Sequence, residues 1–150
     1  MSVTLSHVRR FATLMLGLFC YGLGLGLMVE AKIGIAPWDV LAQGISIQTG
    51  ITYGGASVVV SVLVLLSWIP LKQRFGLGTV LNGLLIGPFA DLWMHWLPEP
   101  QGYLWQLLQF VGGMAIVAFA TGLYVSAQYG TGPRDGLMIG TQRRTGWAFW

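Results

Sequence analysis

The composition of this 150-residue chain excludes a soluble globular domain, because 55% of its residues are hydrophobic and only 9% are charged, whereas soluble domains carry about 25% charged residues. The net charge of +3 includes no dense basic run, which excludes a nucleic-acid-binding surface. The single cysteine, Cys20, can form no internal disulfide, and no Cys/His spacing predicts a metal site. We therefore expect a membrane protein whose main partner is the lipid bilayer.

Four apolar runs are long enough to cross the hydrocarbon core, which takes about 20 residues of helix. They are Phe11–Val29, Tyr53–Leu71, Leu77–Leu97 and Tyr103–Tyr129. The first follows basic residues as a signal peptide does, but no good small-x-small cleavage site is present, so we interpret it as an uncleaved span. The apolar stretch Ile35–Ile47 is too short to cross.

The distribution of Lys and Arg predicts the orientation of these spans. With the N-terminus inside, four spans place Lys32 alone on the outer side. The other seven basic residues then lie on the inner side: Arg9, Arg10, Lys72, Arg74, Arg134, Arg143 and Arg144. Because cytoplasmic loops carry the excess of Lys and Arg, we expect a multi-pass protein of the inner membrane with a cytoplasmic N-terminus.

A segment of the chain occurs twice, 96 residues apart. Gly26–Gly54 aligns without a gap on Gly122–Trp150, and eleven of the 29 pairs are identical. Three predicted spans separate the starts of the two copies, and an odd number of spans inverts the second copy relative to the first. We therefore predict an inverted-topology repeat, which is the architecture of many secondary transporters.

Each copy contains a glycine–proline–aspartate element, Gly34–Asp39 (GIAPWD) in the first and Gly130–Asp135 (GTGPRD) in the second. Glycine allows a tight turn after the span, and proline suits the first position of a helix. We predict that each element begins a short broken or re-entrant helix that ends at Gly50 or Gly146. Two such breaks at corresponding positions indicate a transport site, because helix N-termini suit an anionic group.

The binding candidates in these elements are Pro37, Asp39, Pro133, Arg134 and Asp135. Two interpretations stay open for both acids: each binds a solute or ion, or each only stabilises the first turn of its helix through the helix dipole. Arg134 is either a residue of the membrane interface or an anion-binding group. The duplication does not separate these interpretations, because both would be copied.

The third span adds Asp91 to the candidates. An ionisable residue inside a span is costly and indicates a function by default. Gly83, Gly87 and Asp91 recur every fourth residue and share one helix face, and Pro88 should kink the helix beside them. Asp91 is a candidate proton or cation site; the alternative is a structural partner for a helix terminus or for His95.

Small residues four apart recur in the two spans that the repeat relates. Gly22 and Gly26 lie in the first span, and Ala118 and Gly122 lie at the corresponding positions of the fourth. Because such pairs allow helices to approach closely, the preserved spacing predicts that these two spans meet.

The predicted fold is therefore an all-α membrane protein with four transmembrane helices and short broken or re-entrant helices, part of a 3+3 inverted-repeat fold of six spans. We expect residues 1–97 to form the first three-helix repeat and residues 98–150 to begin the second, inverted one. We expect the second copy to be truncated, because the counterpart of Leu97 would fall 43 residues after Trp150. The alternative is a natural four-span protein.

Three motifs together resemble the YczE/YitT-like bacterial integral membrane proteins. They are the early Gly-x-Ala-Pro-Trp-Asp, the central Gly-Pro-x-x-Asp of Gly87–Asp91, and the late GTGPRDGLM of Gly130–Met138, which is the most specific. The resemblance runs through nearly the whole chain and implies a multi-pass protein of the bacterial inner membrane. It implies no biochemical activity and transfers no catalytic residue.

We expect a small-solute transporter or permease-like protein of unknown substrate, with a small anionic or zwitterionic solute as its ligand. The alternative is a non-transporting membrane scaffold or an assembly or accessory factor, and a homo-oligomer is compatible with either. No Ser/His, Cys/His, HExxH or paired-acid motif and no cofactor fingerprint is present, so we expect no enzymatic activity, no catalytic residue, no cofactor and no metal.

Overall fold

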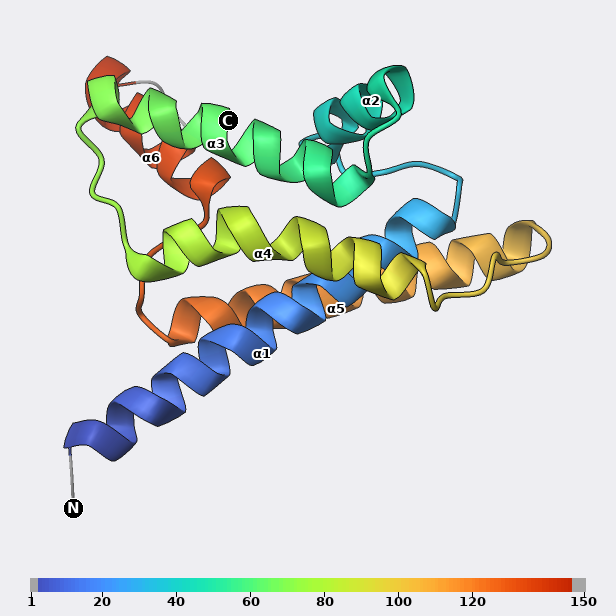
Figure 1. Ribbon diagram of the computed structural model, residues 1–150, viewed down its shortest axis with the longest axis horizontal. Coiled ribbons are helices and arrows are strands. Elements are labelled where there is room, and N and C mark those ends of the chain that lie inside the picture. The colour runs from blue at the N-terminus through green and yellow to red at the C-terminus, as the bar shows by residue number, and fades with distance from the viewer. Residues whose placement is uncertain (1–2, 147–150) are drawn as a thin grey trace.

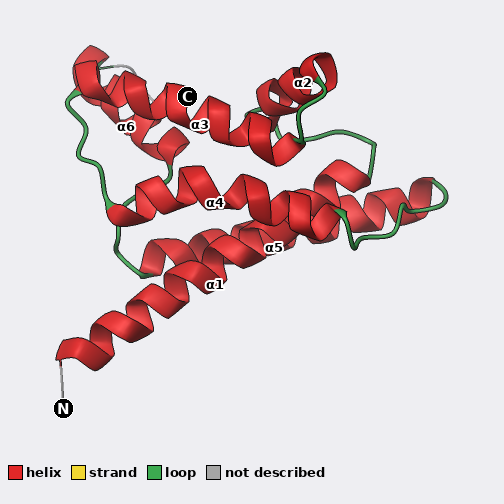
Figure 2. Cartoon of the chain, viewed as in Figure 1, coloured by secondary structure: helices red, strands yellow, loops and turns green. Residues whose placement is uncertain are grey.

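The regular structure of the chain is helical throughout residues 3–146, which are the residues that the computed structural model describes (Figures 1 and 2). The helices are α1 (Val3–Glu30), α2 (Asp39–Thr49), α3 (Tyr53–Leu71), α4 (Leu77–Met94), α5 (Tyr103–Ser126) and α6 (Pro133–Thr145). Of these, α1, α3, α4 and α5 are long and apolar enough to span a membrane. The all-α class and the four predicted spans are therefore confirmed.

The ends of the helices differ from the predicted spans by a few residues. Helix α1 begins at Val3, well before Phe11, because no glycine or proline interrupts the polar and basic residues that precede the apolar run. Helices α4 and α5 end three residues before the predicted ends of their spans. In the first copy the short helix begins at Asp39, with Pro37 and Trp38 in the turn before it.

Helix α4 lies between α1 and α3. Helix α1 packs against α4 and α5, while α3 packs against α4, α2 and α6. The start of α1 meets the end of α5, where Arg10 Nε donates a hydrogen bond to the carbonyl of Ala127. The end of α1 meets the start of α5, where Gln109 Nε2 donates to the carbonyl of Leu27. The two helices therefore lie antiparallel, as Figure 1 shows.

The core follows one face of α1. Its buried residues recur three or four positions apart, the spacing that puts side chains on one helical face: Leu14, Leu18, Tyr21 and Leu25. They pack with small and aromatic residues of the neighbouring helices, including Ala90 on α4 and Ala120 and Tyr124 on α5. Because of this packing, the side chains of Tyr21 and Tyr124, which end in polar hydroxyl groups, lie in the interior of the bundle.

The duplicated segments have similar local backbones, although α6 begins at Pro133 and α2 begins two residues after the corresponding Pro37. Helices α1 and α5 end at Glu30 and Ser126, which are 96 residues apart. The left-handed residues that follow come in pairs with the same separation: Lys32 and Gln128 with φ of 56° each, Gly34 and Gly130 with φ of 152° and 120°, and Gly50 and Gly146 with φ of 74° and 73°. The repeated sequence therefore builds a similar break and short helix twice.

The first and fourth spans meet as predicted, but not through the predicted residues. A Cβ on Gly22 would lie 2.5 Å from the Cβ of Phe89, so this glycine faces α4 instead of α5. The close contact between α1 and α5 is made at Gly24 and Gly113, where a Cβ on Gly24 would lie 2.8 Å from the carbonyl oxygen of Gly113. The spacing of small residues identified the right helices, but it could not identify which face each helix presents.

Most of the basic residues gather at one end of the bundle. The first turns of α1, the loop between α3 and α4, and the end of α6 lie at the left of Figure 1, whereas Lys32 follows α1 at the opposite end. Arg134 is the exception to the predicted distribution, because its guanidinium lies inside the bundle against Tyr21. Six basic residues thus remain at the predicted cytoplasmic end: Arg9, Arg10, Lys72, Arg74, Arg143 and Arg144.

Candidate functional site

The first turns of the two short helices point into the centre of the bundle. Asp39, the first residue of α2, is only 6% exposed and accepts a hydrogen bond at Oδ1 from the Tyr53 hydroxyl, 3.2 Å away. Its second carboxylate oxygen, Oδ2, is buried and has no hydrogen-bond partner within residues 3–146. Burial raises the pKa of the Asp39 carboxyl, and the Arg134 guanidinium and the Tyr53 hydroxyl partly offset that rise.

The second copy brings an arginine and an acid to the same place. Arg134 Nη2 donates a hydrogen bond to the Tyr21 hydroxyl, 2.8 Å away, and its Nε lies 3.8 Å from Asp135 Oδ1. The Tyr124 hydroxyl donates to Asp135 Oδ2, at 3.2 Å. Each acid of the repeat is thus held by a tyrosine hydroxyl from a spanning helix, and the arginine lies between them.

Neither acid caps its own helix through a hydrogen bond. Among the described residues, the side chains of Asp39 and Asp135 bond only to tyrosine hydroxyls and, for Asp135, to Arg134. The N-cap positions are Trp38 and Gly132, and neither makes a side-chain capping bond. Within residues 3–146, the printed hydrogen-bond partners of both carboxylates are thus side chains of spanning helices, and no hydrogen bond joins either carboxylate to the backbone of its own helix.

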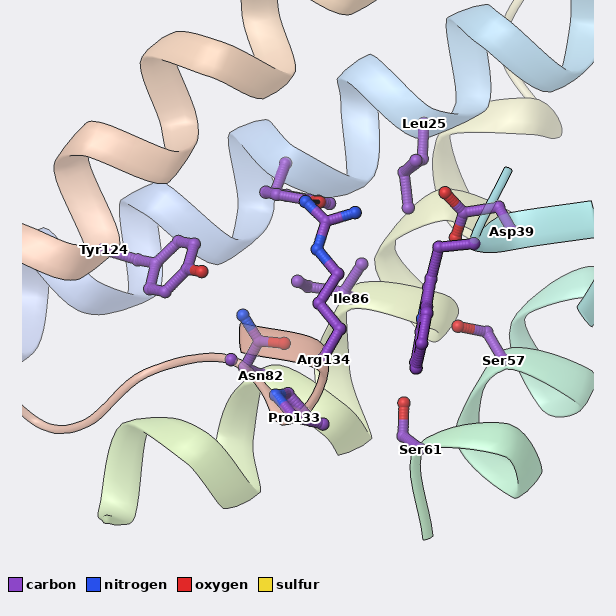
Figure 3. A pocket seen from close by; sticks show the side chains of 12 residues that line it. Leu25, Asp39, Ser57, Ser61, Asn82, Ile86, Tyr124, Pro133 and Arg134 are labelled. Carbon is purple, nitrogen blue, oxygen red and sulfur yellow. Dashed lines mark hydrogen bonds between the residues drawn. The ribbon is translucent and has the colours of Figure 1, made fainter. Parts of the chain in front are cut away.

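A small polar cavity lies between these groups (Figure 3). It has a volume of about 40 Å³, room for a few water molecules. Its polar lining includes Asp39, Arg134, Ser57, Ser61 and Asn82. In the described part of the chain, the side chains of the two serines and of Asn82 make no hydrogen bond, so the cavity holds several polar groups whose bonding capacity is unused.

A larger apolar groove adjoins this cavity. Its volume is about 610 Å³, and it runs between α1, α5 and the segment 35–37. Four residues line both spaces: Tyr21, Leu25, Asp39 and Arg134. The charged residues therefore lie at the junction between a small polar space and a large apolar one.

The two prolines occupy different positions around the site. Pro37 lines the apolar groove in the turn before α2. Pro133 is the first residue of α6, as predicted, and its carbonyl accepts a hydrogen bond from Trp68 Nε1 at 3.0 Å. This bond ties the start of α6 to α3. It therefore helps to position Arg134 and Asp135, which follow Pro133 directly in the chain.

Asp91 lies outside both cavities. Its Oδ1 accepts a hydrogen bond of 2.7 Å from the backbone N–H of Gly54, in the first turn of α3. A carboxylate there satisfies one of the free N–H groups of the helix and complements the helix dipole. The contact matches the alternative of a partner for a helix terminus, whereas Asp91 does not join the cluster around Asp39.

Replacing Asp91 separates the two interpretations of this residue. Asp91→Asn keeps an acceptor for the Gly54 N–H but loses the charge, so we expect a loss of only about 0.3–1 kcal/mol in stability. Asp91→Ala removes the acceptor and should cost roughly 0.5–2 kcal/mol. Apparent melting temperatures of the purified proteins measure both. Equal losses of stability in Asp91→Asn and Asp91→Ala would contradict the role of Asp91 as a partner for the terminus of α3.

Sequence reasoning missed the tyrosines that hold the charged residues of the site: Tyr53 and Tyr124 bond to the acids, and Tyr21 bonds to Arg134. Tyr21, Tyr53 and Tyr124 occupy positions that read as ordinary members of apolar spans, and tyrosine is common near membrane interfaces. Ser57 and Ser61 were missed as well. Their spacing of four residues puts both on one face of α3, which was the available signal.

Comparison with known sequences shows which family this chain belongs to. The profile of a family of unknown function, DUF6198, matches residues 8–150. The chain belongs to this family. The matched region contains both glycine–proline–aspartate elements and the central Asp91 motif, so every candidate residue lies within it.

Three curated relatives agree with this assignment. An uncharacterized protein of Haemophilus influenzae is 38% identical over 95% of this chain and 66% of its own length. The uncharacterized membrane protein YczE of Bacillus subtilis is 34% identical over 93% of this chain and 66% of its own. The uncharacterized protein YyaS of Bacillus subtilis is 26% identical over 83% and 64%, respectively. The YczE-like resemblance is therefore confirmed.

The chain spans about two thirds of the length of these relatives. No solved structure matches it significantly. The relatives thus support the assignment of this chain as a membrane protein with several apolar helices. The description of the site rests on the geometry of this chain alone.

Proposed function

We propose that this chain is part of a small-solute transporter of the bacterial inner membrane, with its N-terminus in the cytoplasm. The observation that carries the proposal is the cluster of Asp39, Arg134 and Asp135 at a cavity where the two duplicated elements meet. Ionisable groups inside a membrane protein are costly, and those that face an internal cavity mark solute or ion pathways. Broken helices in corresponding halves are typical of transporter binding sites.

In this proposal, two inverted halves rock against each other around the site. Three features support an inverted relation between the copies. The left-handed backbone positions recur after 96 residues, α1 and α5 lie antiparallel, and most basic residues gather at one end of the bundle. The solute would occupy the junction between the polar cavity and the apolar groove, and Arg134 would bind its anionic group.

Uptake into proteoliposomes tests the proposal. The native full-length protein is reconstituted and supplied with radiolabelled anionic and zwitterionic solutes. Asp39→Asn and Asp135→Asn should each reduce uptake at least tenfold, because a buried hydrogen bond to a charged group contributes about 1.5–3 kcal/mol. Glu99→Gln is the matched control, since this acid is 68% exposed and pairs only with Lys32.

Two results would contradict the transporter. Unchanged uptake in both aspartate variants would show that the two acids take no part in transport. Stable co-purification with one protein partner, without stabilisation by any solute, would instead favour a membrane scaffold or an accessory factor.

A further inference from the structure

We infer that the solute is a small zwitterion with an apolar body, whose ammonium group binds Asp39 Oδ2 and whose carboxylate binds Arg134. This inference rests on the proposed solute site and names the chemical class that the site accepts. It follows from four features of the cluster: an unpaired oxygen, an unmade ion pair, the net charge and the shape of the two adjoining spaces.

The first feature is the free oxygen of Asp39. A buried carboxylate oxygen without a donor is costly, about 1–3 kcal/mol and more when it is charged. Oδ1 already accepts from Tyr53, so only Oδ2 is available, and it has no donor in the described chain. A ligand that donates hydrogen bonds and carries positive charge removes this cost, and an ammonium group does both.

The second feature is the missing contact between Asp39 and Arg134. Opposite charges attract strongly in an interior of low dielectric constant, and these two side chains line the same cavity. Nevertheless, no ion pair joins them within residues 3–146, because the guanidinium is turned to Tyr21 and Asp135. Figure 3 shows the Arg134 side chain in the middle of the lining residues and the Asp39 carboxylate to its right, with no bond drawn between them. The gap is where a bridging ligand fits.

The guanidinium has donors to spare for such a ligand. Arginine carries five N–H donors in a planar fork, and here it makes one hydrogen bond, to the Tyr21 hydroxyl. Its contact with Asp135 is 3.8 Å long, beyond a hydrogen bond. Arg134 can therefore bind a carboxylate without giving up Tyr21.

The third feature is the charge of the cluster. Two carboxylates and one guanidinium carry a net charge of −1 when all are ionised. Binding of a simple anion would change the net charge of the cluster to −2, and unbalanced charge in a buried site costs free energy. A simple cation would leave the Arg134 donors without an acceptor. A zwitterion satisfies both sides and adds no net charge.

The fourth feature is the shape of the site. The polar cavity of about 40 Å³ holds charged head groups or a few waters but no larger body. The adjoining groove of about 610 Å³ is lined mostly by apolar side chains, including Met28, Phe110 and Met114. Since Asp39 and Arg134 border both spaces, a ligand held by its charged ends extends its apolar part into the groove. An α-amino acid with an apolar side chain has this form.

Binding to the purified full-length protein tests the inference with three matched probes. Leucine carries both charged groups, 3-methylbutylamine lacks the carboxylate, and 4-methylpentanoate lacks the ammonium. Isothermal titration should show leucine binding at least tenfold more tightly than either of the others, because each lost group removes a charge-assisted hydrogen bond. Glycine, which lacks the apolar body, should also bind more weakly than leucine.

Two variants assign the ends of the ligand. Asp39→Asn should weaken leucine binding at least tenfold and leave the affinity for 4-methylpentanoate unchanged, and Arg134→Gln should leave the affinity for 3-methylbutylamine unchanged. The amide oxygen of the Asp39→Asn variant would still accept the Tyr53 bond, and circular dichroism of each variant checks that it folds. Glu99→Gln should bind leucine as the native protein does.

Several results would overturn the inference. Either single-charge probe binding as tightly as leucine would show that one charged group suffices, and absence of binding by all probes would remove the zwitterion site. The zwitterion inference and the transporter proposal can be refuted independently of each other. Leucine binding without uptake would refute transport alone, and uptake of a solute without an ammonium group would refute the zwitterion alone.

Discussion

Replacing Trp68 with alanine is expected to destabilise the protein by about 3–5 kcal/mol, the usual loss when a large aromatic residue is removed from a core. Trp68 is 2% exposed and is among the largest fully buried side chains of the described chain. Its ring stacks on Phe75 with centroids 5.6 Å apart. Gly136 packs directly against the same ring, so the residue joins α3 to α6.

The consequence of this substitution should extend to the site. Trp68 Nε1 holds the carbonyl of Pro133 at 3.0 Å, and Arg134 and Asp135 follow Pro133 in the first turn of α6. Without this bond, α6 loses a contact that sets the position of both charged residues. Solute uptake should therefore fall further than the loss of folded protein explains.

Thermal unfolding of purified variants measures the stability effect. Trp68→Phe keeps a ring but loses the hydrogen bond and some volume, so it should cost only about 1–3 kcal/mol. Trp105→Ala is the control, because Trp105 is 64% exposed and should tolerate the change. Equal losses in Trp68→Ala and Trp105→Ala would show that Trp68 does not hold α6 on α3.

Replacing Gly54 with alanine is expected to force α3 and α4 apart. A Cβ on Gly54 would collide with the carbonyl of Gly87 and with Asp91 Oδ2, and a Cβ on Gly87 would collide with Gly54. Backbone cannot move aside as a flexible side chain can, so overpacking of about 1–3 kcal/mol or more follows. The same change would disturb the hydrogen bond between the Gly54 N–H and Asp91.

Gly112→Ala is the matched control for this prediction. Gly112 also lies inside a spanning helix, but a Cβ there would have no atom within 4 Å. Alanine should therefore stabilise α5 by roughly 0.5–1 kcal/mol through its lower loss of backbone entropy. Melting temperatures that fall equally in Gly54→Ala and Gly112→Ala would contradict the close contact of α3 with α4.

The spans and the breaks between them were predictable from the chain alone. Their signals are local: about 20 consecutive apolar residues are needed to cross a bilayer, and Gly34 and Gly130 stand where the backbone takes a positive φ. The repeat extended this prediction, since identical local signals such as Pro37 and Pro133 build similar local structure. The breaks and the ends of both short helices at Gly50 and Gly146 therefore followed from the sequence, whereas the positive φ of Lys32 and Gln128 did not.

The faces of the helices were less predictable. In a soluble protein the apolar stripe shows which side of a helix faces the core, but in a membrane lipid and core are equally apolar. The sequence therefore placed Gly22 and Gly26 at the contact with the fourth span, whereas Gly24 and Gly113 make it. The count of basic residues placed Arg134 on the cytoplasmic side because it considers only the order of the spans, whereas the guanidinium contacts Tyr21 of α1.

The amino-acid order alone determines that this chain is a membrane protein, where its spans lie and which acids the repeat shares between its copies, because apolar length and glycine–proline breaks act over neighbouring residues. The partners of those acids depend on the packing of distant helices. Asp39 meets Tyr53 and shares a cavity with Arg134, and Asp91 reaches the first turn of α3. No local pattern encodes these contacts, since they form only when α2, α3, α4 and α6 come together.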